Sequence, residues 1–155
     1  MLPHFHFLLG ILLADFLGLL GINGIIPWLI FLGSIGPDFD YLLTFVKTNK
    51  NHRTYFTHYP FTYMSLIFLF FIFRNNFYWF FFGALIHVLF DTIDWEVFIF
   101  APFLTTKFSF LNLDPAIFRG NSNTKDFLFK YYNNKAILII EVIFLIIVTS
   151  SVLFI

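Results

Sequence analysis

Five apolar segments, separated by polar stretches, restrict what this chain can fold into more than any other feature. They run over residues 7–20, 25–35, 61–73, 77–90 and 136–155. A helix that crosses the hydrocarbon core of a bilayer needs roughly 20 apolar residues, and the last segment alone meets that length cleanly. The four shorter segments could tilt, lie partly in the interface or form short hairpins. We predict an all-α, integral membrane protein with about five apolar helices.

The composition agrees with a membrane environment and excludes several classes of function. Charged residues make up 12% of the chain, whereas a soluble domain typically has about 25%. The formal net charge is zero, which argues against nucleic-acid binding through a basic surface. The absence of cysteine excludes disulfides, thiolate zinc ligands and cysteine nucleophiles.

The length fits a single domain over residues 1–155, with residues 136–155 as a C-terminal transmembrane helix. We expect the first apolar segment to belong to the mature protein rather than to a signal peptide. No Lys or Arg precedes it, and no convincing small-residue cleavage site follows it. Residues 103–135 could form a lid, an interfacial helix or a loop, and the oligomeric state stays open.

The distribution of Lys and Arg predicts an orientation in the membrane. If the five segments alternate, all nine Lys and Arg residues except Arg74 lie on one side, which should be the cytoplasm. The same side then receives every histidine and most of the acids near a helix end: His4, His6, Asp38, Asp40, His52, His58, His87, Asp91 and Asp94. We therefore predict a polar His/Asp cluster at the cytoplasmic membrane face.

The fourth apolar segment carries His87, Asp91 and Asp94. Residues four and seven apart share one face of a helix, so the three side chains are expected to point one way. Ionisable groups in a membrane helix are costly and usually functional. His87 and Asp91 could present a nitrogen and an oxygen to one metal ion. Asp94 could then contact one of these ligands without binding the ion itself. Alternatively, Asp91 holds the imidazole by a hydrogen bond.

Two loop motifs add further candidates. In "GPDFDYL", Asp38 and Asp40 either cap the amides of a first helical turn or ligate a metal. In "NHRTYFTHYP", His52 and His58 are six residues apart and would lie on different faces of a continuous helix, so both can bind only if the segment is not one helix. Thr57 or His58 is expected to cap a helix whose first turn contains Pro60.

Arg53, in the second of these motifs, offers a planar donor fork suited to phosphate or carboxylate. Its alternative role is contact with anionic lipid head groups. Of His4 and His6, we favour His6 as a ligand because it begins the first apolar helix. Asp15 and Glu141 lie within apolar segments, and we expect Asp15 to face the bundle and Glu141 to be similar or interfacial.

Together, the histidines and aspartates form a mixed imidazole and carboxylate donor set. Zinc suits such a set, a second ion is plausible from the number of ligands, and manganese and iron stay open. A metal held in this way lowers the pKa of a bound water toward neutrality and so supplies a hydroxide nucleophile.

Four features follow one another along the chain: a histidine that opens the first apolar helix, then "GPDFD", "HRTYFTH" and "HVLFD". In these features the chain resembles the YdjM-like family of membrane-bound proteins, which are inferred to be metal-dependent hydrolases. The resemblance covers about residues 4–102. It implies roles for His6, Asp38, Asp40, His52, Arg53, Thr57, His58, His87 and Asp91. Tyr41 stands where the family has a histidine, Tyr59 replaces a serine, and one extra residue precedes Thr57. The family is also distantly similar to zinc-dependent phospholipase C, which implies phosphoester hydrolysis.

We therefore predict a membrane-bound, zinc-dependent hydrolase that acts on a phosphoester of a lipid or lipid-linked substrate. The predicted metal ligands are His6, Asp38, Asp40, His52, His58, His87 and Asp91. Asp40 and Asp91 are the candidate catalytic carboxylates, and Arg53 is the candidate anion-binding residue. The alternative is a non-catalytic scaffold or binding protein whose cluster is a structural metal site or a polar clamp. A small transporter is a third interpretation, but transport sites lie near the bilayer midplane, whereas these residues lie at helix ends.

Overall fold

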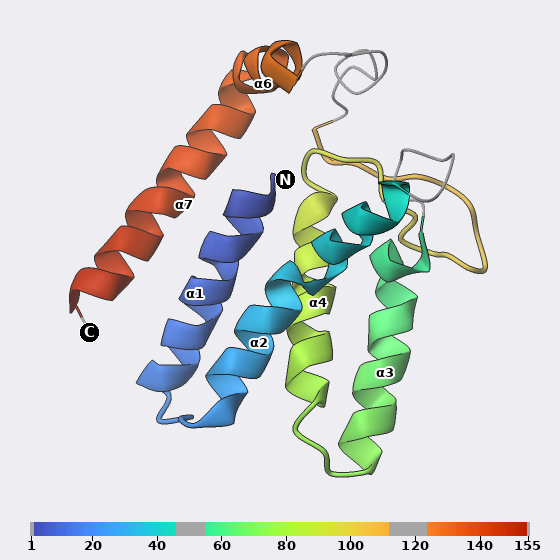
Figure 1. The fold of residues 1–155 in the computed structure, drawn as a ribbon, viewed down its shortest axis with the longest axis vertical. Coiled ribbons are helices and arrows are strands. Elements are labelled where there is room, and N and C mark those ends of the chain that lie inside the picture. Colours follow the sequence, from blue (N-terminus) through green and yellow to red (C-terminus); the bar gives the residue numbers. More distant parts are fainter. Residues whose placement is uncertain (1, 46–54, 112–123, 155) are drawn as a thin grey trace.

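A computed structural model shows a chain built from helices and connecting loops (Figure 1), and it describes residues 2–45, 55–111 and 124–154. The elements are α1 (Pro3–Leu19), α2 (Ile25–Ile35), the 3-10 helices η1 (Gly36–Phe45) and η3 (Phe56–His58), α3 (Pro60–Ile72), α4 (Tyr78–Asp91), α6 (Thr124–Tyr132) and α7 (Lys135–Phe154). In the described residues the β structure is limited to an isolated bridge between Val97 and Phe108. The predicted all-α class is confirmed.

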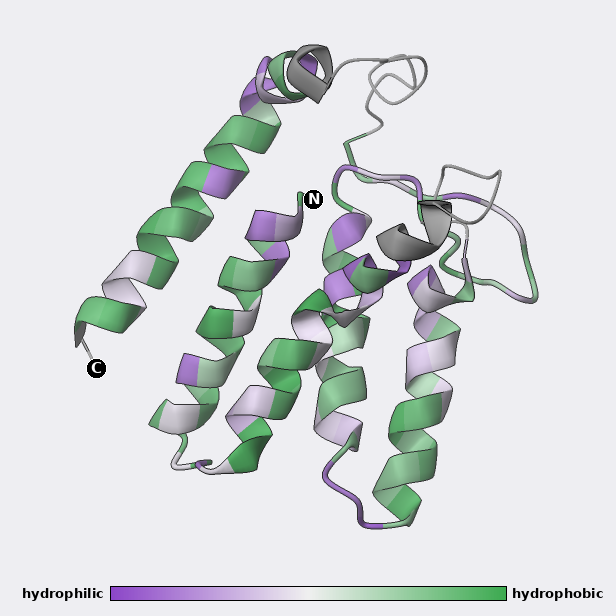
Figure 2. Ribbon diagram, viewed as in Figure 1, coloured by the Kyte–Doolittle hydropathy of each residue, from purple (hydrophilic) through white to green (hydrophobic). Residues whose placement is uncertain are grey.

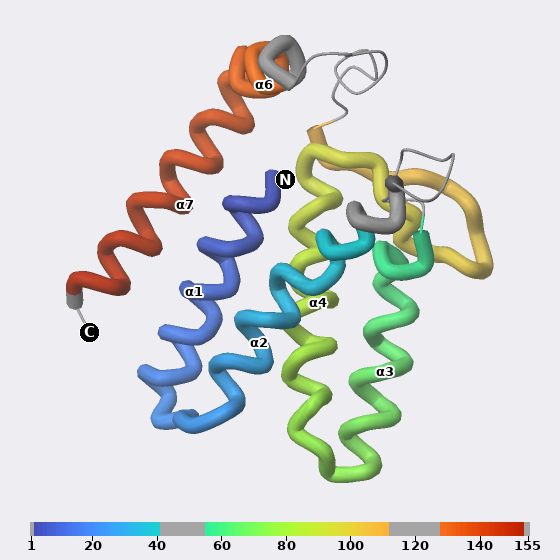
Figure 3. Tube along the Cα trace, in the orientation of Figure 1, coloured from blue at the N-terminus to red at the C-terminus, as the bar shows by residue number. Residues whose placement is uncertain are grey.

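The long helices pack side by side in the order α7, α1, α2, α4 and α3, with each in contact with the next. The short helix α6 lies across the upper end of α7, as the tube view shows most clearly (Figure 3). The N-terminus, η1 and the C-terminal end of α4 also lie toward this upper end. Three segments far apart in the sequence therefore meet at one end of the bundle.

Local sequence explains most of the helix boundaries. Gly21 and Gly24 adopt positive φ angles of 76° and 81° in the turn between α1 and α2, a conformation that glycine adopts without steric cost. Pro60 lies in the first turn of α3, where its missing N–H costs nothing. The expected cap by Thr57 or His58 is wrong. Tyr59 precedes the helix instead, without a side-chain capping bond.

The chain does not leave the helical path after α2, although the second apolar segment ends at residue 35, directly before Gly36 and Pro37. It continues as the 3-10 helix η1, with Asp38 in its first turn. A 3-10 helix has three residues per turn, so side chains two positions apart, such as Asp38 and Asp40, point in different directions. The two aspartates are therefore presented to different neighbours.

Helices α2 and α4 approach each other unusually closely. A Cβ atom on Gly33 would overlap the carbonyl oxygen of Phe80, and a Cβ atom on Gly83 would overlap the carbonyl oxygen of Ile30. Only glycine allows backbones to come this near. This contact places the last turn of α2 directly beside α4.

Many large apolar side chains are exposed along the helices, whereas polar residues are frequent at the upper ends of α1 and α4 and around α6 (Figure 2). Among the described helices, α7 is long and apolar enough over Lys135–Leu153 to cross a membrane, whereas α1, α3 and α4 are shorter apolar helices. The insertion of all five apolar segments therefore stays a prediction.

Candidate metal centre

A buried cluster of histidine and aspartate side chains lies where the upper ends of the helices meet. It contains His6 from α1, Asp38 and Asp40 from η1, His58 from η3, and His87 and Asp91 from α4. His6, His58, His87 and Asp91 are completely inaccessible to solvent, with relative exposures of 0%. Concentrating this many ionisable groups in a buried volume is costly unless they are paired or bind a metal.

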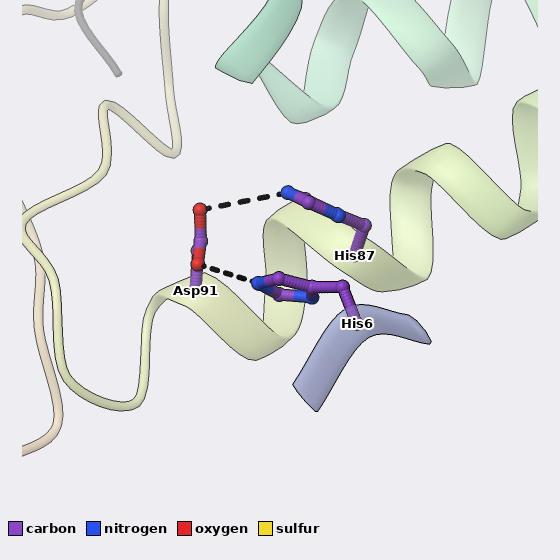
Figure 4. A group of neighbouring side chains, drawn as sticks. All are labelled: His6, His87 and Asp91. Carbon is purple, nitrogen blue, oxygen red and sulfur yellow. Dashed lines mark hydrogen bonds and ion pairs between the residues drawn. The ribbon is translucent and has the colours of Figure 1, made fainter. Parts of the chain in front are cut away.

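The first group of donors consists of His6, His87 and Asp91 (Figure 4). The rings of His6 and His87 stack with centroids 3.6 Å apart, and their nitrogens face Asp91. The Asp91 carboxylate reaches both rings, with Oδ1 3.0 Å from His6 Nε2 and Oδ2 3.7 Å from His87 Nε2. The donor atoms of this group all lie within 4.8 Å of one another.

The second group shares His87 with the first. It consists of Asp38, His58 and His87, whose donor atoms also lie within 4.8 Å of one another. His87 Nε2 lies 3.6 Å from Asp38 Oδ1, and His58 Nε2 lies 3.6 Å from Asp91 Oδ2. His87 and Asp91 are therefore the central pair, in contact with donors from every other element of the cluster.

A backbone carbonyl sets the tautomer of His87. Its Nδ1 lies 2.6 Å from the carbonyl oxygen of Ser34, which can only accept, so the Nδ1 proton is donated there. Ser34 belongs to the last turn of α2, where carbonyl groups lack intrahelical partners. The Gly36 N–H bonds back to the Gly33 carbonyl in an i→i+3 pattern, and in the same pattern the Ser34 carbonyl would face residue 37, which is proline and has no N–H.

Nε2 of His87 consequently lacks the proton and carries a lone pair. It is buried and makes no hydrogen bond to the residues that the structure describes, yet it faces Asp38 Oδ1 and Asp91 Oδ2 at 3.6 and 3.7 Å. A protonated Nε2 would lie about 2.7–2.9 Å from a carboxylate oxygen. Two ligand atoms bound tetrahedrally at about 2.0–2.2 Å from one zinc ion are about 3.3–3.6 Å apart. The observed separations fit donors arranged around a cation better than a direct ion pair.

Asp40 makes contacts of a different kind. Its Oδ2 atom lies 3.1 Å from His58 Nδ1 and accepts a hydrogen bond from the Thr57 hydroxyl. Neither group of clustered donors in the described residues includes Asp40. The structure thus brings the predicted ligands His6, Asp38, His58, His87 and Asp91 together, and it places Asp40 behind His58.

A second polar cluster joins the C-terminal helices to the bundle. The Tyr131 hydroxyl donates to Asp94 Oδ2 at 2.7 Å, and His4 Nε2 lies 3.2 Å from Glu141 Oε2. Burial, and then the Glu141 carboxylate, raise the pKa of Tyr132 to about 12, so its hydroxyl stays protonated beside His4. Asp94 was expected on one helical face with His87 and Asp91, but α4 ends at Asp91, so Asp94 lies beyond the helix, where it contacts Tyr131.

The remaining sequence predictions have separate outcomes. His52 and Arg53 lie outside the described residues. Asp15 faces α7, where its Oδ2 accepts from Ser151 Oγ at 3.3 Å. Sequence reasoning missed the carbonyl of Ser34, for which the Pro37 that follows three residues later is the one local signal. It also missed Tyr63, whose hydroxyl donates to the Thr57 carbonyl at 2.6 Å.

Comparisons with known proteins identify the family. Neither the curated proteins nor the solved structures contain a match to the chain. The family described as "YdjM inner membrane protein" matches residues 1–155, a longer stretch than the motifs between residues 4 and 102 alone indicate. With this family and one helix suited to crossing a membrane, the chain is a membrane-associated protein that belongs to the YdjM inner membrane protein family.

Proposed function

We propose that this chain is a metal-dependent hydrolase that cleaves a phosphoester bond in a lipid or lipid-linked substrate. The observation that carries the proposal is the orientation of His87. Its Nδ1 proton is donated to Ser34, and its unprotonated Nε2 faces the oxygens of Asp38 and Asp91. A divalent cation between them is the simplest way to stabilise this arrangement, and zinc suits imidazole and carboxylate donors.

The clustered residues are proposed to have different roles in this reaction. His6, His58, His87, Asp38 and Asp91 would hold one or two ions, which when bound would lower the pKa of a coordinated water and so supply hydroxide near neutral pH. Asp38 is the most accessible of these side chains, at 16% exposed, so it is best placed to accept the proton of an incoming water. Hydrolysis adds the OH group to phosphorus and breaks the ester P–O bond, and the proton then passes to the departing oxygen.

The membrane setting supports a lipid substrate. The family is one of inner membrane proteins, the helices expose apolar side chains along their length, and the cluster lies at one end of them. A substrate that already resides in the bilayer would meet the site at the head-group plane. Arg53, one residue after His52, is proposed to hold the anionic group of the substrate.

The site is proposed to face the cytoplasm, with all five apolar segments embedded in the membrane. The support comes from charge: if the segments alternate across the bilayer, Arg74 alone of the nine basic residues falls on the opposite side. Arg74 lies in the turn between α3 and α4, at the end of the bundle away from the cluster.

Metal analysis of the detergent-purified protein tests the proposal. We expect near-stoichiometric zinc or another transition metal in the wild type, and its loss from His87→Ala and Asp91→Ala, measured by mass spectrometry. Cleavage of phospholipids in mixed micelles by the loaded protein would then identify the reaction. Well-folded wild-type protein that binds no metal, even after reconstitution, would refute the proposed hydrolase.

Complete burial of four cluster residues favours a second candidate, a scaffold with a structural metal site, because structural sites are closed whereas catalytic sites keep an open position. The replacement Asp38→Asn separates the two. A hydrolase should retain its fold and lose phosphoesterase turnover, whereas a scaffold should lose thermal stability and have no turnover to lose.

A further inference from the structure

A chain of hydrogen bonds contacts His58 on the side of its ring that faces away from Asp91. Its Nδ1 atom lies 3.1 Å from Asp40 Oδ2, in a setting where the two side chains are 0% and 3% exposed. An ionised carboxylate only accepts hydrogen bonds, so the imidazole proton belongs on Nδ1. The lone pair of the ring therefore lies on Nε2, on the side of the ring that faces Asp91.

The arrangement repeats the one found at His87 with a different acceptor. In both rings Nδ1 faces an oxygen, which is the Ser34 carbonyl for His87 and the Asp40 carboxylate for His58. In both rings Nε2 points toward Asp91 Oδ2, at 3.7 and 3.6 Å respectively. Groups outside the clustered ligand atoms thus determine that the lone pair of each imidazole lies on Nε2, the nitrogen that can bind a metal.

We infer that Asp40 is a positioning residue, which orients His58 and increases its basicity without binding the ion itself. This inference rests on the proposed metal centre. Metal-bound histidines usually donate their second N–H to a carboxylate or carbonyl, which fixes the ring orientation and the tautomer. Asp40 makes that contact, and it is absent from both groups of clustered donors in the described chain.

Asp40 is itself oriented by the segment that carries His58. The Thr57 hydroxyl donates to the same oxygen, Oδ2, that faces His58. Tyr63, from the second turn of α3, donates to the Thr57 carbonyl at 2.6 Å and is 7% exposed. Tyr63 therefore fixes η3 against α3, Thr57 fixes the carboxylate, and the carboxylate fixes the imidazole.

The second carboxylate oxygen of Asp40 suggests an alternative role, that of a metal ligand. Asp40 Oδ1 is buried and makes no hydrogen bond within the described part of the chain, so direct ligation through Oδ1 is the alternative that the experiment must exclude. A ligand and a positioning residue differ in what their removal changes. Loss of a ligand lowers the number of ions bound at saturation, whereas loss of a positioning contact lowers the affinity.

Zinc binding by the detergent-purified, full-length protein distinguishes the two roles, measured by competition with a chromophoric chelator. We expect Asp40→Ala to bind as many ions as the wild type at saturation, with about 10–100-fold weaker affinity. Asp40→Asn and Thr57→Val should weaken binding less, because each keeps part of the contact. The matched control Thr149→Val, whose hydroxyl bonds only to its own helix in the described contacts, should bind as the wild type does.

Two results would overturn the inference. A loss of ions at saturation in Asp40→Ala as large as that in Asp91→Ala would make Asp40 a ligand, and an unchanged affinity would leave it without a role. If the alanine variant does not fold, the absorption spectrum of cobalt-loaded Asp40→Asn gives an independent test. An altered ligand set changes the band intensities relative to the wild type, whereas loss of a positioning contact leaves the ligand set unchanged. Folded wild type without any metal would instead refute the metal centre.

Discussion

At the scale of single residues, His4 and His6 show how two similar side chains are assigned different roles. They are two positions apart on α1, so they point to different sides of the helix. His6 is buried and contacts Asp91. His4 is 53% exposed and contacts Glu141. About half a turn of helix thus separates a candidate ligand from a residue that joins two helices.

Replacing each of the two with alanine should give opposite results. We expect His6→Ala to lower the zinc affinity, or the number of ions bound, because it removes a donor beside Asp91. His4→Ala is the matched control and should bind zinc as the wild type does. Zinc titration of both variants checks this, and equal effects would contradict the assignment of His6.

The sequence predicted the cluster at the residue scale because it depends on side-chain types at helix ends. The order of His6, Asp38, His58 and His87 along alternating segments sufficed to bring them to one end. The Ser34 carbonyl could not be predicted in the same way, since every residue has one and only the packing of α2 against α4 selects it. The sequence predicts Asp40 as a ligand, because spacing does not distinguish a ligand from a residue that positions one.

At the scale of elements, the position of α2 against α4 depends on two glycines. Gly33→Ala or Gly83→Ala would place a methyl group against a backbone carbonyl of the facing helix. We expect each to destabilise the protein by about 1–3 kcal/mol, the usual cost of overpacking. Zinc affinity should also fall, because the Ser34 carbonyl would move away from His87.

Gly18→Ala is the control for both substitutions. A Cβ atom at Gly18 meets no other atom within 4 Å, and alanine favours a helix more than glycine does. This variant should be as stable as the wild type or slightly more so. Chemical unfolding in detergent measures all three, and a Gly33→Ala protein with wild-type stability and zinc affinity would disprove the close-packing argument.

The long apolar helices were predictable because a predominantly apolar run of 11 to 20 residues leaves few alternatives to a helix. Observed and predicted ends of these five helices differ by a few residues. For Asp38 the sequence left open a first helical turn or a metal ligand, and the residue does lie in the first turn of η1. The continuity of η1 with α2 could not be predicted, because Gly36 and Pro37 usually end an α-helix, whereas a 3-10 helix accepts a proline near its start. The sequence did not decide between a helix and a loop for α6, because "TKDFLFKYY" has only nine residues and mixes polar with apolar side chains, and short isolated helices are marginal.

At the scale of the whole molecule, the insertion of the helices in the membrane can be tested because the chain has no cysteine. Asn23, Asn76 and Asn133 are exposed in three different turns. We expect Asn23→Cys and Asn76→Cys to react with an impermeant maleimide on one side of the membrane and Asn133→Cys to react on the opposite, cytoplasmic side. Right-side-out and inside-out vesicles separate the two.

Labelling of Asn76→Cys and Asn133→Cys from the same side would contradict the alternating arrangement. Helix α3 has 13 residues and α4 has 14, which gives each a length of about 20 Å, whereas the hydrocarbon core is about 30 Å thick. The membrane topology is harder to predict from the sequence than the helices themselves, because it depends on how short helices and the surrounding lipid adapt to each other.

The contact between His87 and the Ser34 carbonyl also has an evolutionary consequence. A main-chain oxygen is not lost when its side chain changes, so relatives should accept other small residues at position 34. Selection should act instead on Gly33 and Gly83, which bring the carbonyl to the ring, and on Pro37, which leaves it without a competing amide. Among relatives, position 34 should therefore vary although its carbonyl orients His87. Gly33, Gly83 and Pro37 should be conserved, because they place that carbonyl beside the ring.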